Sequence, residues 1–307
     1  MSTFKYQPLE QSDKIRLLVL QPGSGTSPIE CSLLHKTLGT QPYEALSYEW
    51  KDASDCDPMI VVDGCDVRVR KNLRDALLQI RLVEENRYLW IDALCINQAD
   101  VCERNKQVQK MGKIYKGARS VISWLGLASN NSDLAMEKLE SVGEFMEGHD
   151  AKLFSLVDSF QNIQCQAILA LCQRSYWQRA WILQEVFLAR KLVVHCGDKS
   201  SSIVALDNSL CCLGRVREYD KGIVSSAAFE HVLARRAPPQ MNVLSRWVNV
   251  SLSQNYVATE PRDIIYAMLG IASDCQDGEL LPDYEKPLVE RKDSNSFIIK
   301  ESQIIWV

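Results

Sequence analysis

Two short, almost wholly apolar segments, residues 88–96 and 120–125, constrain the fold of this chain more than any other feature. Neither segment alternates apolar with polar residues, as a strand with one solvated face would. Uninterrupted apolar runs of this length are typical of strands that are covered on both faces, as in parallel sheets. A helix is expected between them from about Asn105. This spacing indicates a βαβ unit, with residues 88–96 as a central strand and residues 120–125 beside it.

The rest of the chain adds further strands and helices to this unit. Asp63-Gly64 is the expected two-residue turn of a hairpin over residues 59–69, and Asn72 is expected to cap the helix that follows. Further strands are expected at residues 15–20, 43–50 and 192–197, and further helices at residues 133–147, 153–172 and 177–189. Beyond about residue 200 the pattern becomes helical and irregular. Residues 291–307 fit no element, and their apolar end suggests a truncated or altered terminus.

The length and composition indicate one main domain with an extension. A chain of 307 residues, 46% of them apolar, buries one large core or two small ones. We therefore expect an α/β domain over residues 13–200, with a mostly parallel sheet flanked by helices, and a helical extension over residues 201–307. The net charge of −4 argues against a nucleic-acid-binding surface, which is usually basic.

The sequence also argues against several other classes of protein. No stretch contains the roughly 18–20 consecutive apolar residues that a membrane span needs, and residues 1–10 lack the apolar core of a signal peptide, so a cytoplasmic protein is expected. The eleven cysteines are scattered and the four histidines form no cluster, so no metal site is expected. Neither a Gly-x-Gly-x-x-Gly motif nor a phosphate loop is present, and no bound cofactor is expected.

Two carboxylates have apolar surroundings in the sequence. Glu185 shares a helix face with Trp181, Ile182 and other apolar residues, and burying an ionised carboxylate there costs several kcal/mol unless it is paired. Either Glu185 forms a structural ion pair with a nearby arginine such as Arg179, or it is an acid at the wall of a cleft. Asp92 lies near where a parallel sheet presents its carboxyl-end crevice, so it is either a functional acid or a carboxylate that caps a helix or braces a loop.

Several segments resemble the fungal heterokaryon-incompatibility (HET) domain. Residues 43–50, Tyr-Glu-Ala-Leu-Ser-Tyr-Glu-Trp, are similar to its opening motif, although Lys51 stands where the family usually has glycine. Residues 89–98, Leu-Trp-Ile-Asp-Ala-Leu-Cys-Ile-Asn-Gln, resemble its most specific block, and residues 124–126 and 177–186 resemble later ones. Residues 261–270 and 282–284 are similar to the segment that follows the domain in many such proteins.

The resemblance implies a function and a site. HET domains look like distant relatives of the flavodoxin-like TIR domains, in which a glutamate takes part in cleaving NAD at its nicotinamide–ribose bond. The Trp181-to-Glu185 spacing resembles that of the TIR motif, which implies that Glu185 is a catalytic residue and NAD the substrate. Asp92 is the second catalytic candidate, because of its expected position at the crevice of the sheet. The expected ligand-binding residues are Tyr48, Trp50, Asn97, Gln98, Arg179 and Trp181, with a tryptophan stacking on a ring and Arg179 meeting phosphate.

Three hypotheses therefore remain open. The first is a fungal cell-death domain that cleaves NAD, and the second is a non-enzymatic death adaptor that acts by self-association or through other death-signalling proteins. The third is a hydrolase of another type that uses Asp92. Release of nicotinamide from NAD by the purified protein separates the first hypothesis from the second.

Overall fold

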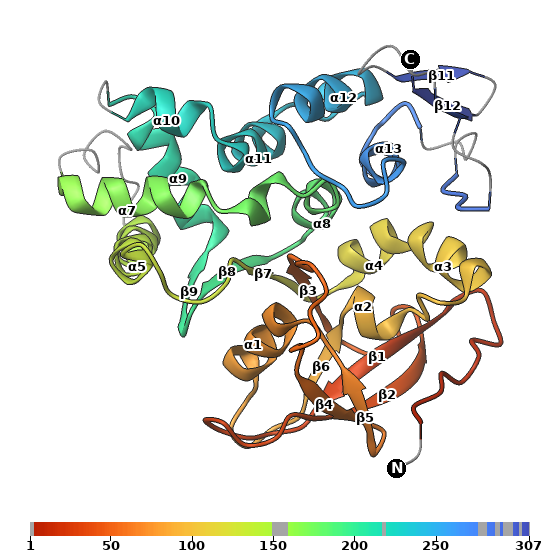
Figure 1. Ribbon diagram of the computed structural model, residues 1–307. Coiled ribbons are helices and arrows are strands. Elements are labelled where there is room, and N and C mark those ends of the chain that lie inside the picture. Colours follow the sequence, from red (N-terminus) through yellow and green to blue (C-terminus); the bar gives the residue numbers. More distant parts are fainter. Residues whose placement is uncertain are drawn as a thin grey trace.

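A nine-stranded sheet is the centre of the molecule in the computed structural model, which describes residues 3–148, 159–216, 219–275, 281–285, 289–290, 297–300 and 303–306. The order of its strands is β5-β4-β2-β1-β6-β3-β7-β8-β9 (Figure 1). The strands are β1 (Lys14–Leu20), β2 (Glu30–Thr37), β3 (Glu44–Tyr48), β4 (Met59–Val62), β5 (Cys65–Arg68), β6 (Arg87–Trp90), β7 (Ser120–Trp124), β8 (Leu192–Cys196) and β9 (Lys199–Ser202). A second, small sheet contains β10 (Val289–Glu290), β11 (Phe297–Lys300) and β12 (Gln303–Trp306).

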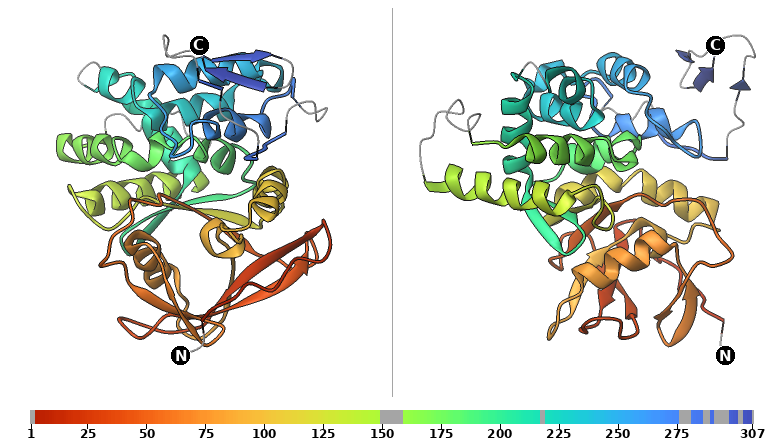
Figure 2. Two further views of the ribbon diagram at one scale, coloured as in Figure 1. Left: turned by 45° about the vertical axis from the view of Figure 1, so that its right-hand side comes forward. Right: turned by 60° about the vertical axis from the view of Figure 1, so that its left-hand side comes forward.

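Helices flank the large sheet, so the α/β class expected from the sequence is confirmed. Figure 1 shows α1 on one side of the sheet and α4 with α8 on the other, and Figure 2 shows α9 to α13 gathered at the end away from β1 and β2. The helices are α1 (Lys71–Ile80), α2 (Asp92–Cys95), α3 (Val101–Val108), α4 (Met111–Gly117), α5 (Ser132–Gly148), α7 (Asn162–Cys172), η1 (Ser175–Gln178), α8 (Ile182–Phe187), α9 (Ile203–Leu213), α10 (Asp220–Val224), α11 (Ala227–Arg236), η2 (Pro239–Met241), α12 (Leu244–Ser253) and α13 (Asp263–Leu269).

The parallel part of the sheet is its centre. Strands β6, β3, β7 and β8 run parallel, whereas β1 pairs antiparallel with β2 and β6, and β9 pairs antiparallel with β8. The β4–β5 hairpin turns through Asp63 and Gly64, whose φ angles of 50° and 74° match a type I′ turn. Short connections of this kind force antiparallel pairing. The sheet is therefore parallel in the middle and mixed at its margins, rather than mostly parallel throughout.

Neighbouring residues of β3 and β7 send their side chains to opposite faces of the sheet. Ser47 and Ser123 are paired in register, and both lie on the face that Tyr176 covers. Trp124, the next residue of β7, points to the other face and donates a hydrogen bond of 2.9 Å to Asn72 in α1. Asn72 was expected to cap this helix, but the N-cap residue is Arg70, and Asn72 lies in the first turn instead.

The central apolar segment is only partly a strand. Strand β6 ends at Trp90, and residues 92–95 form the single helical turn α2, which packs against β1. The prediction of one strand over residues 88–96 was therefore wrong in its second half, because a buried helical turn and a buried strand are equally apolar. Strand β7 was also expected beside β6, but β3 lies between them.

The segment over residues 177–189 is not one helix. The turn η1 ends at Gln178, Arg179 is extended, and α8 begins only at Ile182. The interruption pairs with the C-terminal part of the chain: the Ala180 amide donates to the Val257 carbonyl over 3.0 Å, and the Val257 amide donates to the Gln178 carbonyl over 2.7 Å. This long-range pairing explains why the local pattern missed the break. The helix expected from Asn105 is likewise divided, into α3 and α4.

The described part of residues 201–307 is mainly helical and packs on the rest of the molecule. Strand β9 leads directly into α9, which contacts α5. The boundary at residue 200 therefore stays a prediction. Of the helix expected at residues 153–172, α7 covers residues 162–172, and residues 153–158 lie outside the described residues. No element was expected over residues 291–307, but their described part forms β11 and β12.

Candidate functional site

Asp92 and Trp50 lie together at the carboxyl ends of β6 and β3. The indole Nε1–H of Trp50 donates to both carboxylate oxygens of Asp92, over 3.1 and 3.0 Å. The Ala93 amide donates to Asp92 Oδ1 over 2.7 Å. Burial raises the pKa of Asp92, although the nearby Arg179 and these hydrogen bonds oppose that shift. The result is a fixed, half-buried carboxylate beside an aromatic ring.

Glu185 lies in the interior beneath this pair. Its side chain is 1% exposed and accepts a hydrogen bond of 2.5 Å from Ser47. The guanidinium of Arg179 is 3.9 Å from Glu185 Oε2 and also donates to the Tyr48 carbonyl. Burial raises the pKa of Glu185 to about 7, against the opposing charge of Arg179. Asp92 raises this pKa further, so both carboxylates interact with Arg179 and with each other.

A chain of hydroxyl groups leads away from Glu185 into the sheet. The Tyr176 hydroxyl is 2.7 Å from Ser47 Oγ and donates to Ser123 Oγ over 2.8 Å. The Tyr115 hydroxyl, which donates to the Leu46 carbonyl over 3.3 Å, also lowers the pKa of Glu185. The buried carboxylate is therefore surrounded by hydroxyl groups and one guanidinium, which satisfy its hydrogen-bonding capacity without solvent.

A cavity of about 550 Å³ adjoins Arg179 and Asp92. Five of the residues expected in the site line it, namely Trp50, Asp92, Gln98, Arg179 and Trp181. Three do not. Glu185 lies behind Arg179, Tyr48 is buried, and its hydroxyl has no hydrogen-bond partner among the described residues. Asn97 lines a separate cavity of about 260 Å³ beside the N-terminal segment.

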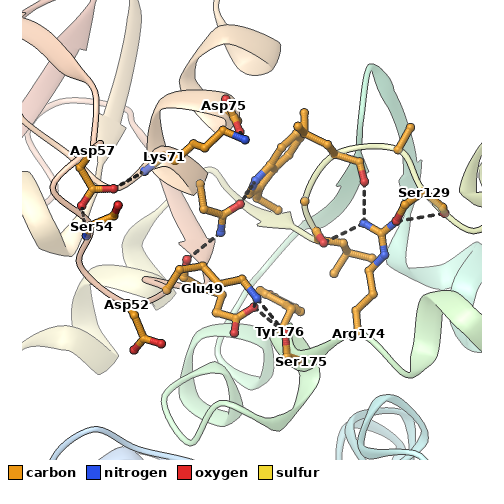
Figure 3. A pocket seen from close by; sticks show the side chains of 17 residues that line it. Glu49, Asp52, Ser54, Asp57, Lys71, Asp75, Ser129, Arg174, Ser175 and Tyr176 are labelled. Atoms are coloured by element: carbon orange, nitrogen blue, oxygen red, sulfur yellow. Dashed lines mark hydrogen bonds and ion pairs between the residues drawn. The ribbon is translucent and has the colours of Figure 1, made fainter.

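A second cavity of about 550 Å³ opens next to the first, between α1 and the loop after β7 (Figure 3). The two cavities share Glu49, Lys51, Asp52 and Ser175. Charged groups at the second cavity form hydrogen bonds that hold neighbouring loops. Arg174, for example, donates to the Leu125 and Leu127 carbonyls and to Ser129 (Figure 3). The first cavity, which the expected site residues line, is therefore the candidate functional site.

Sequence reasoning missed several residues of this site. The cavity is completed by Arg104 of α3 and by residues of the C-terminal part, among them Glu260, Asp263 and Tyr284. Tyr284 donates to Asp263 Oδ1 over 2.5 Å, and its amide donates to Asn105 Oδ1 over 3.0 Å. The only signal for these residues was that Asp263 and Tyr284 belong to segments that resemble the HET family.

Neither a metal site nor a membrane-crossing helix is found in the part of the chain that the structure describes. No three side chains of His, Cys, Asp or Glu come together there in a group that could hold a metal ion. None of its helices combines the length and the apolar character that a membrane span requires.

Comparison with known proteins identifies the domain around this site. Residues 43–185 match the family model described as heterokaryon incompatibility protein (HET). This chain carries a HET domain. The HET domain contributes Trp50, Asp92 and Arg179 to the cavity, and the residues after it contribute Asp263 and Tyr284.

A curated relative extends the similarity beyond the HET domain. The chain is 26% identical over 351 aligned residues to heterokaryon incompatibility protein 6, OR allele, of Neurospora crassa. The alignment covers 92% of this chain and 51% of the relative, so the chain spans about half the length of that protein. No solved structure matches the chain.

Proposed function

We propose that this HET-domain protein acts in fungal heterokaryon incompatibility, and that it triggers cell death by cleaving NAD at the nicotinamide–ribose bond. The incompatibility role is supported by the family match and by the name of the Neurospora crassa relative. One observation carries the enzymatic part. Asp92, with a raised pKa, lines a cavity beside Trp50 and Trp181. A carboxylate and aromatic rings are the groups that cleavage of a ring–ribose bond requires.

The proposed reaction is a hydrolysis. The bond between the ribose carbon and the nicotinamide nitrogen breaks, and its electron pair leaves with nicotinamide. The carboxylate of Asp92 stabilises the positive charge that develops on the ribose and accepts a proton from the attacking water. Water supplies the hydroxyl group of the ADP-ribose product, and the proton is then released to solvent.

Glu185 has a positioning role in this proposal. Because it lies behind Arg179, it does not face the cavity, and it acts on the site by holding the guanidinium of Arg179. Arg179 in turn lowers the pKa of Asp92 and lines the cavity. Losing Glu185 therefore changes both the orientation of Arg179 and the protonation of Asp92.

Nicotinamide release from NAD by the purified full chain tests the proposal. We expect release by the wild-type protein and at least a hundredfold slower release by Asp92→Asn, which keeps the shape but removes the charge. Asp75→Asn, a change in α1 outside the candidate cavity, is the matched control and should keep the wild-type rate. Absence of nicotinamide release from the folded wild-type protein would contradict the enzymatic proposal.

A second candidate function is a non-enzymatic death adaptor that acts by self-association. The observation that favours it is the complete enclosure of Glu185 by Ser47, Tyr115 and Arg179, as expected for a structural carboxylate. In that case cell death depends on the fold alone. Asp92→Asn would then kill as efficiently as the wild-type protein.

A further inference from the structure

Arg104 differs from the other two cations that line the candidate cavity. Arg179 is engaged with Glu185 and with the Tyr48 carbonyl. Lys51 forms an ion pair of 2.6 Å with Glu49 and a hydrogen bond of 3.0 Å with Ser175. The Arg104 guanidinium forms neither a hydrogen bond nor an ion pair with any residue that the structure describes, and its Nε is buried without a partner.

An aromatic ring holds the Arg104 guanidinium in place. The guanidinium carbon lies 4.4 Å from the centre of the Tyr284 ring, a distance typical of cation–π contacts. Tyr284 is itself fixed, because its hydroxyl donates to Asp263 and its amide donates to Asn105. The stacking orients the planar guanidinium and leaves its N–H groups without acceptors. A pre-oriented guanidinium of this kind is suited to bidentate binding of phosphate.

The carboxylates around Arg104 already have partners of their own. Glu260 is held by Arg262 over 2.9 Å, and Asp263 accepts the hydrogen bond from Tyr284. Asp92 accepts the hydrogen bonds from Trp50, and Asp52, which also lines the cavity, is exposed to solvent. Arg104 therefore keeps its positive charge available to a ligand, although acidic residues lie nearby.

We propose that Arg104 is the phosphate-binding residue of the cavity, and that Tyr284 positions it for a phosphate-bearing nucleotide. Trp50 and Trp181 line the same cavity and supply aromatic surface for the base or the nicotinamide ring. This assignment rests on the proposed function for the identity of the nucleotide. It moves the phosphate contact from Arg179 to Arg104. It also makes Tyr284, which lies outside the matched HET domain, part of the ligand site.

Binding of ADP-ribose and of adenosine, which lacks phosphate, tests this proposal by calorimetry. We expect the wild-type protein to bind ADP-ribose at least tenfold more tightly than adenosine. Arg104→Met should weaken ADP-ribose binding at least tenfold and leave adenosine binding unchanged, because a charged hydrogen-bonded contact to phosphate is lost. Inorganic pyrophosphate, as a third probe, should bind more weakly than ADP-ribose, since it makes no ring contact.

Four further variants separate the proposed role from general effects. Arg104→Lys keeps the charge but not the planar fork, so it should show an intermediate loss. Tyr284→Leu should weaken ADP-ribose binding through loss of the stacking, whereas Tyr284→Phe keeps the ring and should retain most of the affinity. Lys106→Met removes an exposed charge two residues along the chain, outside this cavity, and should have no effect.

The results can overturn the proposal without deciding the proposed function. If ADP-ribose binds no more tightly than adenosine, or if Arg104→Met and Lys106→Met weaken binding equally, Arg104 is not the phosphate-binding residue. If ADP-ribose binding depends on Arg104 while NAD is not cleaved, this inference stands and the enzymatic proposal fails. If NAD is cleaved and the folded Arg104→Met variant binds ADP-ribose normally, the enzymatic proposal stands and the inference about Arg104 fails.

Discussion

The guanidinium of Arg179 lies 3.9 Å from Glu185 Oε2, and it is the positive charge closest to that buried carboxylate among the described residues. The same guanidinium interacts with Asp92, which lines the cavity. One cation therefore links an interior carboxylate to a cavity-facing one. Changing either carboxylate is expected to alter the charge balance of the other.

Stability should depend on pH through Glu185. Burial raises its pKa to about 7, above the ordinary value of 4.5, so the folded state favours the protonated form. The stability that this protonation provides is fully present below about pH 4.5 and is lost as the pH rises to about 7. Glu185→Gln removes the titration, so the loss of unfolding free energy between pH 5 and pH 8 should be smaller in the variant. The difference, up to about 3 kcal/mol, is measured by urea unfolding at both pH values. Equal pH dependence in the two proteins would show that the Glu185 pKa is not raised.

Glu185→Gln should abolish killing when the protein is overexpressed in a fungal host. Glutamine is nearly isosteric with glutamate, but it no longer holds the charge of Arg179 in place. The melting temperature of the same variant is the control. If the ion pair with Arg179 dominates, the unpaired arginine costs about 3–5 kcal/mol and the melting temperature falls markedly. A stable Glu185→Gln protein that still kills would rule out any role of this residue in the site.

Trp50→Phe should raise the pKa of Asp92 further. Phenylalanine keeps most of the apolar contact but removes the indole N–H that donates to both carboxylate oxygens. The cost in stability should be about 1 kcal/mol. In an active enzyme, the ascending limb of the pH–rate profile should move to higher pH, because Asp92 acts as a carboxylate. A limb that stays in place would indicate that Asp92 is not the titrating group.

Gly270→Ala should destabilise the contact between α13 and α8. A Cβ atom at this position would overlap the side-chain amide of Gln184, which is buried. Overpacking of this kind costs about 1–3 kcal/mol. Adding Gln184→Ala removes the obstructing amide, so the double variant should lose less stability than the sum of the two single losses. Strict additivity of the free energies in thermal unfolding would show that the two residues do not clash.

Local patterns predicted the elements but not their assembly into the site. The Asp63-Gly64 hairpin follows from short-range rules and agrees with the structure. Asp92, in contrast, was expected within a strand over residues 88–96, but it begins the helical turn α2. The contact of Ser47 with Glu185 joins residues 138 positions apart, and that of Asn105 with Tyr284 joins residues 179 positions apart. No periodicity encodes such contacts, because they depend on how the finished elements pack. The break at Arg179 was missed for the same reason.

The pairing of Val257 with Gln178 and Ala180 has a consequence for exchange between related proteins. It places one wall of the cavity in a part of the chain that lies after the matched HET domain. A chimaera that takes its residues beyond 200 from a relative would keep Asp92 and Glu185. The residues at and around positions 263 and 284 would come from the relative. The chimaera should then have the ligand preference of the protein that supplies its C-terminal part, and any NAD cleavage should depend on the protein that supplies its N-terminal part.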